Sequence, residues 1–234
     1  MSRWRRWVLR ELIYVVVLGT PIALFFLVAI PRADAARLLK ELNQVRVRST
    51  SFNRVEKMAA QFGGNAACVG DNCLFEFQNV WLHRLHLAPL TEFSVMLRRG
   101  GSALDPGGGT VAAMDMAMLV TRDFHQGGTI ASALVFERSR PGPNGPYQAS
   151  IVIGANGQPN RTIVQLSPAS TAVQRKQARA FNLQCLTQLG GCKTSRQLLP
   201  GVWRGARRLE DVYAPPAAGS SSSRAAADTS ATIF

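Results

Sequence analysis

Residues 110–138, TVAAMDMAMLVTRDFHQGGTIASALVFER, decide how this chain folds. The stretches at 110–122 and 129–138 alternate between apolar residues and polar or small ones, which is the period of β-strands with one buried face. HQGG at 125–128 supplies the glycines of a tight connection between them. A parallel pair of strands needs a long crossover, so this short connector predicts an antiparallel hairpin.

The same period continues on both sides of this hairpin. Five further stretches alternate in the same way, at 73–80, 81–87, 92–99, 147–154 and 161–166. Turn residues separate the stretches, as DPGGG at 105–109, RPGPNGP at 140–146 and NGQPN at 156–160. The pattern predicts one antiparallel sheet of about six to seven strands. With two or three helices packed against it, the fold class is α+β.

The segments flanking the sheet have helical spacing. Residues 52–62 place their apolar side chains on one helix face, and Ser51 stands at the N-cap position. A second helix is predicted over 167–189, because it opens with Ser-Pro and ends before two glycines. Residues 33–43 continue helical spacing from the N-terminus, and the alternation at 45–47 predicts a short strand.

The chain begins with the basic leader MSRWRRWVLR, followed at 12–30 by nineteen uncharged, mostly apolar residues. At about 1.5 Å per residue this run makes a helix roughly 28 Å long, close to the hydrocarbon thickness of a bilayer. It therefore predicts a single-pass transmembrane anchor in a bacterial-type inner (plasma) membrane. The arginines packed into the first ten residues favour a cytoplasmic N-terminus and an extracytoplasmic domain. Four leader residues are expected at the membrane interface: Trp4, Arg5, Arg6 and Trp7.

The first 35 residues have a second interpretation, a cleavable signal peptide. The tripeptide at 33–35 is Ala-Asp-Ala, which fits the small-x-small cleavage pattern, so cleavage after Ala35 would release a protein that begins at Ala36. The apolar core of a signal peptide is typically about 7–15 residues long, which is shorter than this run. The length therefore favours an uncleaved anchor.

Composition divides the chain into four parts. At 47% hydrophobic and 18% charged residues, the chain is globular in character. The C-terminal segment PPAAGSSSSRAAADTSATIF is of low complexity and is predicted to be disordered. The expected parts are a leader at 1–11, an anchor at 12–30, an extracytoplasmic α+β domain at 33–214 and a tail at 215–234.

The formal net charge is +13, and arginine supplies most of it. A basic extracytoplasmic domain favours anionic partners, such as lipid headgroups, acidic polymers of the envelope or another envelope protein. A general preference for arginine in this chain would give the same charge without a partner. No helix-turn-helix or RNA-binding motif accompanies the charge, so nucleic acid is not an expected partner. The candidate anionic-partner surface consists of the basic clusters Arg175, Lys176, Arg179, Arg204, Arg207 and Arg208.

The four cysteines fall into two close pairs, Cys68 with Cys73 and Cys185 with Cys192. Outside the cytoplasm, an even number of cysteines in local pairs is typical of disulfides. Three connectivities are possible, and the spacing favours bonds within each close pair. The sequence therefore predicts two disulfides that each close a short loop.

Two residue sets are candidate metal ligands. Cys68, Cys73, His83 and His86 have the spacing C-x4-C-x9-H-x2-H, which supplies four potential zinc ligands. However, an odd offset on the predicted strand 81–87 points the two histidines to opposite faces. Three methionines also share one face of a strand and suit Cu(I), or else form part of a buried core: Met114, Met116 and Met118.

Recognisable catalytic motifs are missing from the sequence. It contains no G-x-S-x-G, no H-E-x-x-H and no phosphate-binding loop, so we assign no catalytic residue and expect no cofactor. The function favoured by the sequence is a membrane-anchored extracytoplasmic protein that serves as a non-catalytic interaction or structural module of the cell envelope. Two alternatives stay open, a periplasmic copper- or zinc-binding module and a hydrolase of unrecognised type.

Overall fold

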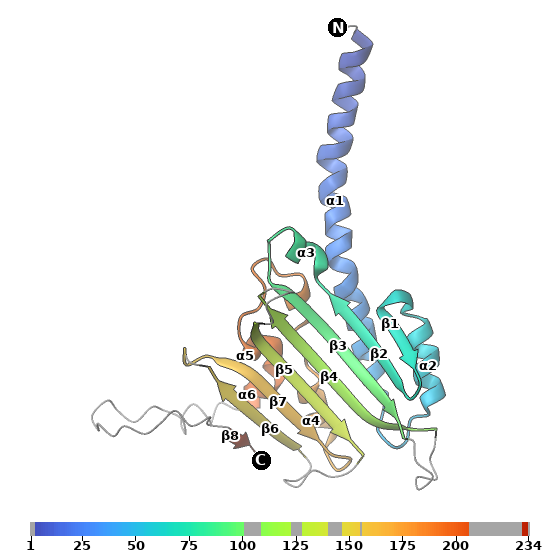
Figure 1. Ribbon diagram of the computed structural model, residues 1–234, viewed down its shortest axis with the longest axis vertical. Helices are drawn as coiled ribbons and strands as arrows, with labels where there is room; N and C mark the ends of the chain where they lie inside the picture. Colours follow the sequence, from blue (N-terminus) through green and yellow to red (C-terminus); the bar gives the residue numbers. More distant parts are fainter. Residues whose placement is uncertain are drawn as a thin grey trace, which may run out of the picture.

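A mixed β-sheet with helices on one side forms the body of the molecule in the computed structural model (Figure 1). The structure describes residues 3–100, 109–122, 128–139, 147–154, 156–205 and 231–233, without the side chains of 3–6, 8–9, 21–25, 27 and 231–233. Within these residues the sheet has eight strands, in the order β1-β2-β3-β4-β5-β7-β6-β8. The strands are β1 (Ala66–Val69), β2 (Asn72–Gln78), β3 (Leu90–Arg99), β4 (Val111–Thr121), β5 (Thr129–Arg138), β6 (Tyr147–Ile153), β7 (Pro159–Leu166) and β8 (Ala231–Ile233).

One pair of neighbouring strands departs from the predicted antiparallel pattern. β5 and β7 run parallel, with Leu134 beside Ile163, whereas the other neighbouring pairs of the described sheet are antiparallel. The cause is the position of the β6–β7 hairpin. Its second strand, not its first, lies beside β5, so the chain crosses over β7 before it turns back. The α+β class is confirmed, and the sheet is mixed.

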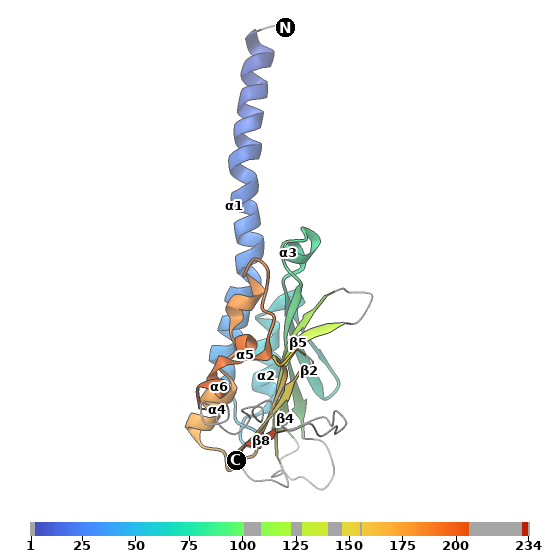
Figure 2. The ribbon, with the colours of Figure 1, turned by 90° about the vertical axis from the view of Figure 1, so that its left-hand side faces the viewer.

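The helices lie on one side of this sheet, as the side view shows (Figure 2). They are α1 (Arg3–Leu42), α2 (Phe52–Ala60), α3 (Val80–Arg84), α4 (Ala172–Ala178), α5 (Ser195–Leu198) and α6 (Pro200–Gly205), with 3₁₀ turns η1 (Gly63–Asn65) and η2 (Leu183–Leu186). α3 is the exception, because it lies at one end of the sheet beside α1. We call the side under the helices the covered face and the other side the open face.

The core lies between the covered face and the helices. Alternate residues of the central strands point into it, including Phe77, Phe93 and Val135, each at most 1% exposed. The C-terminal part of α1 contributes Leu38 and Leu42, which are fully buried. α2 lies where the sequence places it and buries the apolar face predicted for 52–62.

α1 is one continuous helix whose N-terminal part projects from the domain (Figures 1 and 2). From Ala35 onward it packs into the core, whereas Leu12 and Val15 are 60% and 70% exposed. Among the described residues, no helix has the combined length and apolarity that define a membrane span. The helix predicted at 12–30 is present, and its role as a transmembrane anchor is not confirmed.

The predicted strand at 81–87 is wrong, because this segment forms α3 and the turn after it. Asn79 explains the departure. Its side chain donates to the Pro89 carbonyl oxygen at 3.1 Å and accepts from the Thr91 backbone N–H at 2.7 Å. These bonds join the end of β2 to the start of β3 and let the chain leave the sheet between them.

Two other predicted elements are shorter or absent. The helix predicted over 167–189 is only α4, because it begins after Thr171, which forms a capping box with Gln174. Asn182 then caps the 3₁₀ turn η2 instead of continuing the helix. The strand predicted at 45–47 does not form, and the Val45 N–H instead donates to the Leu42 carbonyl oxygen in the turn that ends α1. Of the predicted tail at 215–234, the described part is β8, and the rest lies outside the described residues.

Candidate functional site

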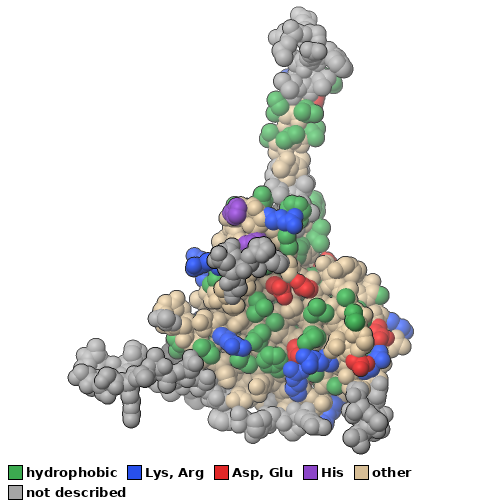
Figure 3. Space-filling model, viewed as in Figure 1, with side chains coloured by type: hydrophobic (Ala, Val, Ile, Leu, Met, Phe, Trp, Pro, Cys, Tyr) green, Lys and Arg blue, Asp and Glu red, His purple; other side chains and the backbone are tan. Residues whose placement is uncertain are grey.

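Among the described residues, no helix packs over the open face, which faces the viewer in Figure 3. Hydrophobic side chains gather over the middle of the sheet there, with charged side chains around them. The face exists because each strand alternates, so that residues between the core positions point outward. An uncovered sheet face with apolar side chains is a candidate binding surface.

A groove of about 660 Å³ lies on the open face across β4, β5, β7 and β6. The sheet register places its apolar residues together, with Leu134 beside Ile163 and Leu119 one strand away. Its polar residues lie toward the beginning of β5 and β7, where Arg161 stands opposite Ser132 and Val152. The groove is lined by Leu119, Thr129, Ser132, Leu134, Val152, Asn160, Arg161 and Ile163.

Arg161 is exposed at the polar end of this groove. Among the described residues it forms no salt bridge. Its guanidinium group is always charged and matches a carboxylate in geometry. Among its described lining residues, the groove therefore combines an apolar floor with one cationic donor.

A pair of carboxylates lies on β2 and β3 of the same face. The Gln78 side-chain amide donates to Glu76 and, at 3.3 Å, to Glu92. Burial raises the pKa of Glu92, the charge of Glu76 adds to this rise, and hydrogen bonds from Gln78 and Ser94 oppose it. A shared amide donor thus holds two like charges close together.

A second charged group joins β3, β4 and β5. Asp115 forms salt bridges with Arg138 at 2.7 Å and with Arg98 at 3.2 Å. Burial raises the pKa of Asp115, and the two arginines oppose this rise. With an arginine within salt-bridge distance of each carboxylate oxygen, Asp115 organises the surface and is not presented to a ligand.

The methionine face predicted from the sequence lies in the core. Met114, Met116 and Met118 are fully buried on the covered face of β4. They pair in register with Leu97, Val95 and Phe93 of β3. This is the packing expected of a hydrophobic core.

The predicted zinc set does not form. Cys68 and Cys73 are joined in a disulfide, so neither can supply a thiolate. His83 lies on α3 and His86 in the turn that follows it, where the backbone has a φ of 57°. No group of three or more His, Cys, Asp or Glu side chains comes together in the described part of the chain.

Two arginines of the predicted partner surface form ion pairs within the domain. Arg179 is buried and pairs with Glu137 at 2.6 Å, and Arg175 pairs with the same carboxylate at 3.2 Å. Both are therefore occupied by contacts within the domain, which corrects their assignment to a partner surface. Lys176 and Arg204 are exposed, whereas Arg207 and Arg208 lie outside the described residues.

Of the four residues predicted at the membrane interface, the structure describes one side chain. Trp7 is exposed on α1. The side chains of Trp4, Arg5 and Arg6 lie outside the described set. Their predicted role stays a prediction.

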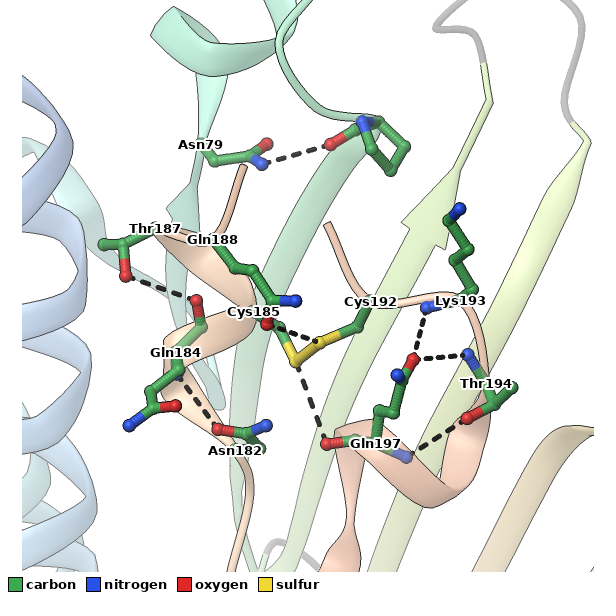
Figure 4. Close-up of a disulfide and its surroundings, with 11 residues drawn as sticks. Asn79, Asn182, Gln184, Cys185, Thr187, Gln188, Cys192, Lys193, Thr194 and Gln197 are labelled. Carbon is green, nitrogen blue, oxygen red and sulfur yellow. Dashed lines mark hydrogen bonds between the residues drawn. A yellow bond between two sulfur atoms is a disulfide. The ribbon is translucent and has the colours of Figure 1, made fainter. Parts of the chain in front are cut away.

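The second disulfide, between Cys185 and Cys192, is buried beside the sheet (Figure 4). Gln197 braces the loop after it, since its side-chain oxygen accepts from the Lys193 and Thr194 backbone N–H groups. Both predicted disulfides are present with the favoured pairing. Such bonds persist in oxidising compartments, which is consistent with an extracytoplasmic domain.

Sequence reasoning missed the groove, because its residues come from four strands whose order was not known. The core position of Glu137, by contrast, follows from the sequence pattern. Glu137 lies on β5 two residues after the core residue Val135, so the alternation of this strand already placed a charge on the core side.

We compared the chain with protein-family models, with curated proteins and with solved structures, and none of the three comparisons finds a match.

Proposed function

We propose that this protein is a single-pass membrane-anchored extracytoplasmic module that binds another envelope protein through its open face and does no chemistry on it. One observation carries the proposal. α1 continues without a break from the core into a projecting segment whose apolar side chains have no protein cover. Such a helix needs a nonpolar environment that the domain itself does not supply.

The argument for an anchor rests on exposed apolar area. Every residue from 12 to 18 is apolar or aromatic and about half exposed or more. Soluble monomers rarely expose continuous apolar patches larger than a few hundred Å², because each Å² left in water costs about 25 cal/mol. A bilayer would cover this segment, and the run at 12–30 has the length to cross one.

The argument for the compartment rests on the two disulfides. Both close short loops within the domain, and together they use all four cysteines of the chain. A domain in a reducing cytosol would not keep such bonds. The leader arginines support an N-terminus on the cytoplasmic side.

The argument for a polypeptide partner rests on the groove. Leu134 and Ile163 offer an apolar floor, and Arg161 lies at its polar end. A protein segment with an apolar side chain followed by a carboxylate would satisfy both features. The basic charge of the chain favours such an acidic partner at long range.

Cell fractionation tests the anchor and its orientation. We expect the full-length protein to stay with membranes after carbonate extraction, and its domain to be digested by protease added outside the inner membrane. Intact mass after alkylation without reduction should show no added alkyl groups. A soluble protein, or one that gains four alkyl groups, would refute the proposal.

Photocrosslinking in intact cells tests the partner surface. A photoreactive residue at Leu134 or Ile163 should capture one and the same protein. The matched control is Leu74, which is exposed on β2 away from the groove, whereas Leu134 and Ile163 are half-buried. We expect no capture from Leu74 and loss of capture when Arg161→Glu is added. Equal capture from all three positions would exclude the groove as the binding site.

A further inference from the structure

Four exposed apolar side chains gather at the end of the domain beside the projecting part of α1. Trp81, Leu85 and Leu87 belong to the segment between β2 and β3, and Leu189 to the loop between η2 and α5. They are 42%, 46%, 47% and 68% exposed, respectively. We call these four residues the apolar tip. Figures 1 and 2 both show α3, which carries Trp81, at this end.

The two segments of the tip are held to each other. The Gly190 backbone N–H donates to the Leu87 carbonyl oxygen at 2.8 Å. The Asn79 side chain closes the base of the first segment, and the Cys185–Cys192 disulfide closes the second, as Figure 4 shows. The tip therefore keeps its exposed apolar side chains in a fixed arrangement.

The tip lies at the level where the apolar run of α1 ends. Val28 and Pro31 of α1 line a small cavity together with Trp81, Leu82 and Leu186. The run at 12–30 finishes between these two α1 residues. If the run crosses the bilayer, the tip is at the headgroup region of the outer leaflet.

The charge of the tip segments themselves fits a lipid surface with negative headgroups, and the carboxylates that flank the first segment, Glu76 and Glu92, lie on β2 and β3 of the open face. The sequence has no Asp or Glu at 77–91 or at 167–205. Arg84 is exposed, and its guanidinium carbon lies 5.6 Å from the centre of the Trp81 ring. Tryptophan beside arginine, with leucines nearby, is the composition of segments that lie in a membrane interface.

We propose that the apolar tip inserts into the headgroup region of the membrane that holds α1, as a second lipid contact that favours anionic phospholipids. This inference rests on the anchor in the proposed function. A helix alone lets a domain tilt about its point of exit. A second contact limits that tilt and sets the angle at which the open face is presented.

Tryptophan quenching in lipid nanodiscs tests the contact on the full-length chain. A variant with Trp4, Trp7 and Trp203 changed to Phe leaves Trp81 as the reporter. The matched control adds Trp81→Phe and Val69→Trp, which moves the reporter to the exposed turn of the β1–β2 hairpin, at the far end of the sheet. The nanodiscs contain phosphatidylcholine and phosphatidylglycerol, with a phospholipid spin-labelled near the headgroup as the quencher.

We expect the spin-labelled lipid to quench Trp81 at least about twofold more than the reporter at 69, because interfacial tryptophans lie at headgroup depth. Aqueous iodide should show the opposite order. Adding Arg84→Glu should reduce the lipid quenching of Trp81 in these nanodiscs and change it little in phosphatidylcholine alone.

The outcomes separate the two proposals. A chain that leaves the lipid during carbonate extraction refutes the anchor and the tip together. A chain that stays with the lipid, while iodide quenches Trp81 as strongly as the reporter at 69, refutes the tip and leaves the anchor standing. Trp81 shielded from both quenchers would indicate contact with protein and would also overturn the lipid assignment.

Discussion

Two carboxylates, each held between two arginines, lie on opposite faces of the same sheet. Glu137 points from β5 into the covered face, where it meets Arg175 and Arg179. Asp115 points from β4 to the open face, where it meets Arg98 and Arg138. The Glu137 and Asp115 side chains are 2% and 12% exposed, but the arginines of Asp115 are 47% and 42% exposed.

The same chemistry therefore has different consequences on the two faces. Arg179 also donates to the Leu42 carbonyl oxygen at 2.7 Å, and Arg175 donates to Ser170 and Pro168 carbonyl oxygens. The covered group thus joins β5, α4 and the end of α1 away from water. The arginines of the open group are exposed to solvent, where dissolved ions screen the salt bridges and limit their contribution to stability. The covered face holds the fold together, which leaves the open face available for binding.

Glu137→Gln gives the largest expected effect, because it leaves the buried Arg179 without a charged partner. Breaking a buried ion pair on one side costs about 3–5 kcal/mol. The measurement is guanidinium unfolding of the full chain in detergent, followed by near-UV circular dichroism. The matched control is Glu56→Gln, whose partner Arg99 is at 2.7 Å in a pair that is 42% and 32% exposed. Equal losses from both changes would contradict the comparison.

The two disulfides extend the comparison to covalent bonds. Cys185 and Cys192 are both buried, whereas in the other pair Cys73 is buried and Cys68 is exposed, and backbone pairing of the β1–β2 hairpin already places these two residues opposite each other. Replacing both cysteines of the buried pair by Ser should cost about 3 kcal/mol, from loop entropy plus buried hydroxyls. The same double change at 68 and 73 should cost about 2 kcal/mol. Unfolding midpoints under non-reducing conditions would measure this, and the reverse order would be evidence against it.

The sequence predicts the parts of this fold that follow from local periodicity. The alternation at 129–138 places Val135 in the core, and the apolar spacing at 52–62 gives the buried face of α2. The departures come from contacts between distant residues. Asn79 removes 81–87 from the sheet by bonding to Pro89 and Thr91, and no periodicity signals such a bond.

The candidate site was less predictable than the fold. Arg161 and Ile163 form one groove with Leu119 only because β7 inserts between β5 and β6. The sequence pattern predicts consecutive antiparallel hairpins, and it does not indicate that β7 lies between β5 and β6. The prediction that Arg175 and Arg179 form a partner surface was wrong for a related reason. Their partner Glu137 lies on β5, far from them in the sequence.

Asp115→Asn tests the open side of the comparison and should have a small effect. The two salt bridges would be lost, but burial of the charge, which raises the pKa of Asp115, would be relieved as well. Because burial is the larger cause and the net shift of the pKa is upward, the expected change in the free energy of unfolding at neutral pH is no more than about 0.5 kcal/mol. Unfolding of the variant at low and high salt measures it. A loss as large as that of Glu137→Gln would mean that the open face also stabilises the fold.

Glu92→Gln gives the smallest effect on the free energy of unfolding. At neutral pH its sign is opposite to that of Glu137→Gln. Burial and the charge of Glu76 raise the pKa of Glu92 above its ordinary value, so the folded state binds this proton more tightly than the unfolded state. Stability from this group is therefore present at low pH and is lost as the pH rises through the raised pKa. The glutamine of the variant carries no charge at any pH, so the variant does not lose this stability. Its free energy of unfolding should exceed that of the wild type by about 0.3 kcal/mol at pH 7 and match it near pH 4.

The thermal midpoint of the full chain in detergent at these two pH values measures the effect, which should be about 1 °C at neutral pH. Glu76→Gln is the control, because it removes the neighbouring charge but leaves Glu92 buried. It should recover part of the gain, since burial is the larger cause of the raised pKa of Glu92. A destabilised Glu92→Gln at neutral pH would show that the hydrogen bonds from Gln78 and Ser94 outweigh burial, and that this carboxylate contributes to the fold as Glu137 does.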